Sequence, residues 1–184
     1  MWRIVAVALT AAAFAGAQGT GGAGPGPGGG LVVAPLTQDE ASRLVFMREE
    51  EKMARDVYAF LALKWNPRIF GNIARSEETH FQQTGAMLQR HGIGDPAAGM
   101  GAGEFANPTL AAMYAELTAK GARSVRDALE VGVLIERLDI ADLEAGLAET
   151  RNPEIKRLYT NLLNASYNHL DTFEWVLEVV AGID

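Results

Sequence analysis

The chain has 184 residues, of which 16 are basic and 23 acidic, so its net charge of −7 argues against a protein that binds nucleic acid by neutralising phosphates. Apolar residues make up 48% of the chain and charged residues only 21%, which excludes wholesale disorder and allows a packed core. Because there is no cysteine, disulfides, iron–sulfur clusters, thiolate zinc sites and cysteine nucleophiles are excluded, and any metal must be held by oxygen and nitrogen atoms.

The first 36 residues are predicted to lie outside the folded domain. Residues 1–17 combine a positive charge at Arg3, an apolar run and a final Ala-Gly-Ala, which is the pattern of a secretory signal peptide. The apolar run is shorter than the roughly 20 residues that cross a bilayer. Residues 18–36, rich in glycine and proline, are predicted to be a flexible linker. We therefore expect a secreted or periplasmic protein without a membrane span once the signal peptide is removed.

Residues 37–183 are predicted to form one all-α domain. Capping signals and prolines, beginning with a capping box at Thr37 and Glu40, predict helices at about 37–65, 67–91, 124–149 and 153–182, and a short helix over 108–120. The first two and the last two long helices have short links, so each pair is expected to form an antiparallel hairpin. The long link between the hairpins can cross the length of a bundle, which predicts a four-helix bundle with a crossover that carries the short helix.

The inward face of each long helix, identified from its three- and four-residue spacing, is apolar except for a few acids and imidazoles near mid-helix. In chain order these are Glu51, Glu77, His80, Glu136, Asp139 and His169. Antiparallel packing places mid-helix positions at one level, so we expect the six side chains to converge. Glu50 lies on a neighbouring ridge that is nearly as apolar, and the pattern alone does not decide between Glu50 and Glu51.

Four inward carboxylates need compensation, because a buried ionised acid without a partner costs several kcal/mol and a domain is stable by only about 5–15 kcal/mol. The acids can take up protons, pair with basic residues or bind cations. The inward faces carry no Lys or Arg at this level, which excludes the second solution. Two divalent cations would balance the four acids, with His80 and His169 as neutral ligands. Tyr58 is interpreted either as a core residue or as a hydrogen-bond donor and redox-active neighbour of the metals.

The pattern resembles the ferritin-like superfamily, whose four-helix, carboxylate-bridged dinuclear metal proteins include ferritins, bacterioferritins and rubrerythrins. The shared features are Glu51 with Tyr58 seven residues later, the Glu77-x-x-His80 pair, the long crossover, Glu136 and His169. More narrowly, the strings EEEKMARDVY at 49–58, SEETH at 76–80 and NHL at 168–170 resemble the DUF2202 proteins, a ferritin-like family of unknown function.

One position departs from the superfamily pattern. The superfamily usually carries a glutamate three residues before the histidine of the last helix, and here that residue is Ser166. Asp139, three residues after Glu136, can restore the count of four carboxylates, much as rubrerythrins carry an additional acid at this spacing. Aspartate is one methylene shorter than glutamate, so the spacing leaves open whether Asp139 reaches both metals or one.

The resemblance implies iron, or alternatively manganese, and chemistry on O2 or H2O2. We therefore expect a di-iron oxidoreductase that oxidises Fe(II) or reduces peroxide. Without cysteine it has no rubredoxin-type domain, so electrons must come from the metal, a small reductant or another protein. The alternatives are a metal carrier without turnover, in which Ser166 marks a site unsuited to oxygen chemistry, and an interaction bundle whose inner acids stay protonated. The expected partners are metal ions and the oxidant, not nucleic acid, and a homodimer is a candidate assembly.

Overall fold

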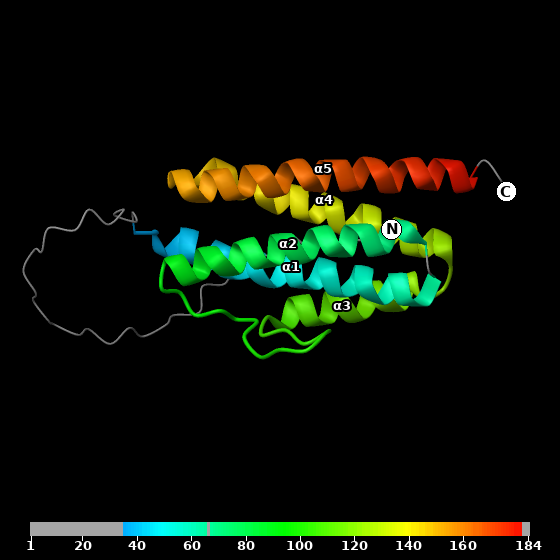
Figure 1. Ribbon diagram of the computed structural model, residues 1–184, viewed down its shortest axis with the longest axis horizontal. Helices are drawn as coiled ribbons and strands as arrows, with labels where there is room; N and C mark the ends of the chain where they lie inside the picture. The colour runs from blue at the N-terminus through cyan, green and yellow to red at the C-terminus, as the bar shows by residue number, and fades with distance from the viewer. Residues whose placement is uncertain (1–34, 66, 182–184) are drawn as a thin grey trace, which may run out of the picture. The chain divides into compact units, whose positions relative to one another are not determined.

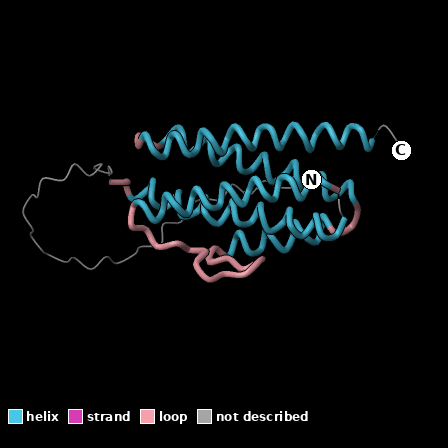
Figure 2. Tube along the Cα trace, in the orientation of Figure 1, coloured by secondary structure: helices cyan, strands magenta, loops and turns pink. Residues whose placement is uncertain are grey.

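The computed structural model describes residues 35–65 and 67–181. The predicted signal peptide, and all but the last two residues of the predicted linker, lie outside the described residues. The described part is all-α, with no strand in it (Figures 1 and 2). Its helices are α1 (Gln38–Trp65), α2 (Arg68–Arg90), α3 (Pro108–Gly121), α4 (Val125–Glu149) and α5 (Pro153–Ala181). Within this part, no helix has the length and apolar character needed to cross a bilayer.

Local capping interactions explain where the helices begin and end. Thr37 and Glu40 form the predicted capping box, in which each backbone N–H donates to the other's side chain, at 2.9 and 3.2 Å. Ser124 caps α4 by accepting from the backbone N–H of Asp127 at 3.0 Å. Beyond α2, Gly92 has a φ of 66°, a left-handed conformation that glycine adopts without strain. These contacts involve residues close in sequence, so the sequence predicts the helix ends well.

The helices form two antiparallel pairs that face each other. Helix α1 packs along α2 and α4 packs along α5, while thinner contacts between α1 and α4 and between α2 and α5 join the pairs (Figure 1). Helix α3 packs against α1 and α4. The apolar core includes Leu44, Met47 and Leu61 of α1 together with Leu143 and Leu162 from the opposite pair. The inward faces of the four long helices therefore meet between the two pairs.

Helix α1 is buried almost all round, because the loop before α3 covers its outer side. The loop is held by buried charged residues of α1 that the sequence analysis did not identify. Lys52, 1% exposed, donates from Nζ to Asp56 Oδ2 and to the carbonyl of Gly101, each at 2.7 Å. The Glu49 carboxylate accepts from the backbone N–H of Ala106 at 2.6 Å. Lys52 is paired with Asp56, and Glu49 is held by backbone N–H groups, so each buried charge has the polar partners that make its burial tolerable.

A close helix–helix approach near the middle of the domain depends on Gly132 of α4. A Cβ at this position would lie 2.6 Å from the ring of Phe173, which also packs against the Tyr58 ring at a centroid distance of 5.4 Å. We expect Gly132→Ala to lower the free energy of unfolding by about 1–3 kcal/mol through overpacking, measured by urea denaturation. Gly71→Ala is the control, because its Cβ would come no closer than 4.0 Å to Ala62. Equal stability of Gly132→Ala and the wild type would contradict the expectation.

Candidate metal centre

The structure brings the predicted acids and imidazoles together between the two helix pairs. Helix α1 supplies one acid, α2 an acid and an imidazole, α4 two acids, and α5 an imidazole. All are buried except His169, whose side chain is 12% exposed. In chain order the residues are Glu51, Glu77, His80, Glu136, Asp139 and His169.

Five of these residues form two groups of three that share Glu77. In the first group, ligand atoms of Glu51, Glu77 and His80 lie within 4.8 Å of one another. Nδ1 of His80 is 2.7 Å from Glu77 Oε2 and 3.4 Å from Glu51 Oε2. The spacing of three residues between Glu77 and His80 places both on the same face of α2. This group therefore combines two carboxylates and one imidazole nitrogen.

The second group contains Glu77, Glu136 and His169, again with ligand atoms within 4.8 Å of one another. Nδ1 of His169 is 2.8 Å from Glu77 Oε1 and 3.5 Å from Glu136 Oε2. The 2.8 Å pair lacks the alignment of a hydrogen bond, so both of these buried atoms are without a hydrogen-bond partner. Glu77 thus presents one carboxylate oxygen to each imidazole and lies between the two groups.

Asp139 lies beside these groups and belongs to neither. Its Oδ2 accepts a 2.5 Å hydrogen bond from the Ser166 hydroxyl, and its Oδ1 is buried without a partner. Burial, with the charges of Glu136 and Glu77 nearby, raises the pKa of Asp139 to about 8 despite the Ser166 hydrogen bond. In the sequence, Ser166 is only a departure from the superfamily pattern, and the bond from Ser166 to Asp139 was not predicted.

The structure places Glu51 in the cluster and Glu50 outside it. Both side chains are buried, at 2% and 4% exposed. Burial, together with the charges of Asp139 and Asp142 of α4, raises the pKa of Glu50. Among the described residues, Glu51 belongs to a group of three potential metal ligands whose ligand atoms lie within 4.8 Å of one another, and Glu50 belongs to no such group. Of the two alternatives that the sequence left open, Glu51 is therefore the candidate ligand.

Tyr58 contacts the cluster through Glu136. The phenol hydroxyl donates to Glu136 Oε1 at 2.6 Å and lies 3.4 Å from the carbonyl oxygen of Gly132. Burial, with Glu136 beside it, raises the pKa of Tyr58 well above its usual range, so the phenol keeps its proton. This contact fits the interpretation of Tyr58 as a donor that orients a ligand, because one oxygen of Glu136 is engaged and the other faces His169.

The shifted pKa values of the cluster residues reflect an excess of buried acidic groups. Burial raises the pKa of Glu51, and it raises the pKa of Glu136 to about 7. Burial also acts on Glu77, but the close polar contacts and charges of His169 and His80 outweigh it and lower its pKa to about 2. Against their own burial, His80 and His169 have raised pKa values, about 9 for His169, because of the carboxylates around them. In the described part of the chain, the ion pairs of the cluster acids are all with these two imidazoles.

The donor set fits divalent cations. Glu51 Oε1, Glu77 Oε1 and Asp139 Oδ1 are acceptor atoms that are buried without a hydrogen-bond partner. Unpartnered buried acceptors are unfavourable, and bound cations would supply the positive partners that these oxygens lack. Carboxylate oxygens together with imidazole nitrogens are ligands that iron and manganese accept.

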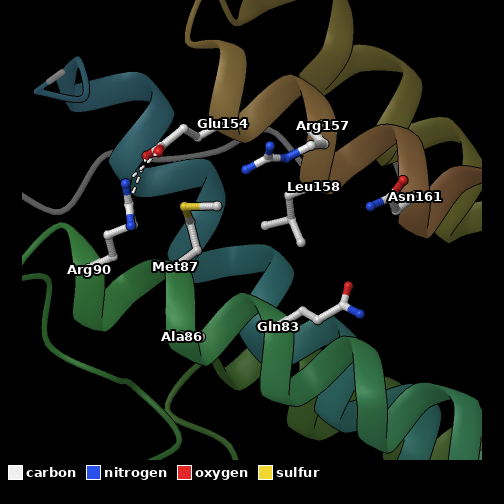
Figure 3. A pocket seen from close by; sticks show the side chains of 8 residues that line it. All are labelled: Gln83, Ala86, Met87, Arg90, Glu154, Arg157, Leu158 and Asn161. Carbon is white, nitrogen blue, oxygen red and sulfur yellow. Dashed lines mark hydrogen bonds and ion pairs between the residues drawn. The ribbon is translucent and has the colours of Figure 1, made fainter. Parts of the chain in front are cut away.

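The most exposed residue of the centre lies at the contact between α2 and α5. His169, the most exposed of the six residues, lies there with Nε2 at 3.1 Å from the Ser76 hydroxyl of α2. Further along the same contact is a groove of about 240 Å³, shown in Figure 3. Gln83, one turn after His80, lies at one end of the groove, and the Arg90–Glu154 ion pair of 2.7 Å lies at the other.

Comparison with known proteins identifies the family. Residues 40–183 match the family model described as "Uncharacterized protein domain (DUF2202)". The chain belongs to the DUF2202 family. It is similar to the uncharacterized protein MJ0754 of Methanocaldococcus jannaschii, with 46% identity over 139 residues, which cover 76% of this chain and 75% of that protein. This DUF2202 chain therefore shares most of its length with a protein from an archaeon.

Two solved structures resemble this DUF2202 chain. The crystal structure of hypothetical protein MJ0754 from Methanococcus jannaschii superposes with a TM-score of 0.80 at 43% identity and covers 83% of this chain and 87% of that one. The crystal structure of a DUF305 fragment from Deinococcus radiodurans gives a TM-score of 0.61 at 22% identity, with coverage of 79% and 99%. The similarity to MJ0754 extends to both sequence and fold, whereas the similarity to the DUF305 fragment is one of fold alone.

Proposed function

We propose that α1, α2, α4 and α5 form a ferritin-like four-helix bundle that binds two divalent metal ions, and that the loaded protein oxidises Fe(II) or reduces peroxide. The observation that carries the proposal is the position of Glu77 between two groups of ligands, each with its own imidazole and at least one further carboxylate. A carboxylate in this position would help to hold an ion in each group. The positive charge of two divalent ions would also balance the negative charge of the four ionised acids, which are Glu51, Glu77, Glu136 and Asp139.

Iron is the first choice of metal and manganese the second, because carboxylates and imidazoles suit both and stabilise their higher oxidation states. When bound, the two ions supply the electrons that reduce the oxidant. The chain's own residues hold and orient them. Glu77 and the imidazoles set the spacing of the two groups, Tyr58 orients Glu136, and the apolar core residues surround them.

The first test is metal content. The wild-type protein, loaded anaerobically with Fe(II) or with Mn(II) and then desalted, is expected to retain about two ions per chain, measured by elemental analysis. His80→Ala should lose at least one ion. His91→Ala is the matched control, since His91 lies at the end of α2 with Nε2 at 3.7 Å from Glu154 and contacts no cluster residue in the described structure. A wild-type protein that stays metal-free after loading would contradict the proposal.

The second test separates turnover from simple binding. Stopped-flow mixing of the Fe(II)-loaded protein with O2 or H2O2 is expected to produce a near-ultraviolet ferric absorption band on the first turnover. Unaltered spectra with two ions bound would favour a metal carrier. The observation that favours a carrier is Ser166, which occupies the position on α5 where the superfamily pattern has a metal-binding glutamate.

We also propose that the protein acts outside the cytoplasm, as the predicted signal peptide at residues 1–17 suggests. Cleavage after Ala17 would make Gln18 the first residue. The mass of the protein recovered from the periplasm or the medium tests this directly, and an intact N-terminus in the cytoplasmic fraction would contradict it.

A further inference from the structure

Ser166 and Asp139 form a buried contact that links α5 to α4 inside the centre. Ser166 is three residues before His169, which places its side chain on the same inward face of α5. It is 1% exposed and Asp139 is 6% exposed. Ser166 Oγ lies 2.5 Å from Asp139 Oδ2 and 2.9 Å from the carbonyl oxygen of Leu162.

The distances indicate where the Ser166 proton points. A hydroxyl has one proton to donate, and two acceptors lie within reach of it. A separation of about 2.5–2.7 Å is typical of a hydroxyl that donates to a carboxylate, whereas neutral pairs are longer. The Ser166 hydroxyl is the donor in both contacts, and the contact to Asp139 is the shorter of the two, so Asp139 is its main partner.

The bond leaves Asp139 with one engaged oxygen and one free oxygen. Oδ1 is buried and has no hydrogen-bond partner. Asp139 is the foremost charged neighbour acting on Glu51, and its charge also acts on His80. Both of those residues belong to the first ligand group, whereas Glu136, one turn earlier on α4, belongs to the second. Helix α4 thus presents Glu136 to the second group, and it places Asp139, with one free oxygen, beside both groups.

We infer that Asp139 is the fourth carboxylate ligand of the centre and that Ser166 positions it, so that the carboxylate absent from α5 is supplied by α4. The inference rests on the proposed two-metal site and adds how this chain completes it. Aspartate is one methylene shorter than glutamate, so it has less reach and a narrower choice of geometries. The Ser166 hydroxyl fixes one oxygen of Asp139 and leaves the other free to bind a metal ion. A small residue at 166 is also needed, because a longer side chain would occupy the place of the Asp139 carboxylate.

The test compares Mn(II) binding in four variants with the wild type, using titration calorimetry and the electron paramagnetic resonance signal of free Mn(II). We expect Asp139→Asn to retain one ion per chain instead of two. Ser166→Ala should keep two sites but weaken one of them about 10- to 100-fold, the usual effect of removing a group that orients a ligand. The third variant exchanges the two positions, Asp139→Ser with Ser166→Glu, and should recover the second ion that Asp139→Ser alone loses.

Thr160→Ala is the matched control, because the Thr160 hydroxyl also bonds the carbonyl four residues earlier on α5, at 2.7 Å, but is exposed. Its Mn(II) binding should equal that of the wild type. Thermal melting of the metal-free proteins verifies that each variant folds, and the exchange variant keeps the test valid if Ser166→Ala does not fold.

The outcomes separate the inference from the proposed function. Two Mn(II) ions bound at wild-type affinity by Asp139→Asn or by Ser166→Ala would overturn the inference alone. A folded exchange variant that binds no more Mn(II) than Asp139→Ser would overturn it as well. A wild-type protein that binds no Mn(II) or Fe(II) would overturn the proposed function, and the inference with it.

Discussion

Glu77→Gln is expected to remove both metal ions, because Glu77 is the residue that the two ligand groups share. Glutamine keeps the size of the side chain but loses the charge and offers one oxygen in place of two. Glu77 Oε2 lies 2.7 Å from His80 and Oε1 lies 2.8 Å from His169, so the substitution affects both groups. We expect Mn(II) affinity to fall by more than about 100-fold, beyond the loss caused by removing an orienting group.

Calorimetric titration with Mn(II) and elemental analysis after Fe(II) loading measure this effect. Glu78→Gln is the matched control, since Glu78 is the next residue of α2 and its side chain is 46% exposed. It pairs with Arg55 at 2.9 Å, and surface pairs of this kind contribute little to stability. A Glu77→Gln protein that keeps one ion at wild-type affinity would show that the two groups do not depend on a common carboxylate.

The metal-free protein is expected to lose stability as pH rises from 5 to 8. The pKa of Glu136 is raised to about 7 and that of Asp139 to about 8, mainly by burial. Between their ordinary pKa values and these raised ones, the folded state binds protons that the unfolded state has released, so the free energy of unfolding falls with pH. The raised pKa of His169, about 9, acts in the same direction, because its stabilisation is present below pH 6.5 and is lost as pH rises through 9.

Glu77 acts in the opposite direction outside this window. Its pKa of about 2 means that its contribution is present above pH 4.5 and is lost only as pH falls toward 2. The net expectation is a decrease in the free energy of unfolding between pH 5 and pH 8, to which each group contributes about 1.4 kcal/mol for every pH unit between its unfolded and folded pKa values. Mn(II) should reverse the trend, because bound metal replaces protons at the ligands and binds more tightly as pH rises.

Urea denaturation at pH 5, 6, 7 and 8, with a chelator and then with Mn(II), measures both curves. Asp139→Asn serves as the internal control, since an uncharged amide removes one of the titrating acids and should make the metal-free curve less steep. A metal-free curve that is flat over this range, or that rises with pH, would contradict the expectation and the electrostatic description of the centre.

Local patterns in the sequence are sufficient to predict the helices and the level of the bundle at which the acids and imidazoles lie. Thr37 with Glu40, and Ser124 with Asp127, mark helix starts through contacts between residues three positions apart. Such contacts form within a single turn of chain, so they can be inferred without knowing what packs against the helix. The three- and four-residue spacing identified the inward positions for the same reason.

Which of these side chains contact one another depends on tertiary packing. Helix α1 carries buried charges on its outer side because the loop before α3 covers it, and burial all round erases the polar–apolar contrast that would distinguish Glu50 from Glu51. The place of Glu77 between two imidazoles and the bond from Ser166 to Asp139 depend on how each helix is rotated about its axis. That rotation is set by packing between residues far apart in the chain, and a sequence pattern defines it only to within a neighbouring ridge.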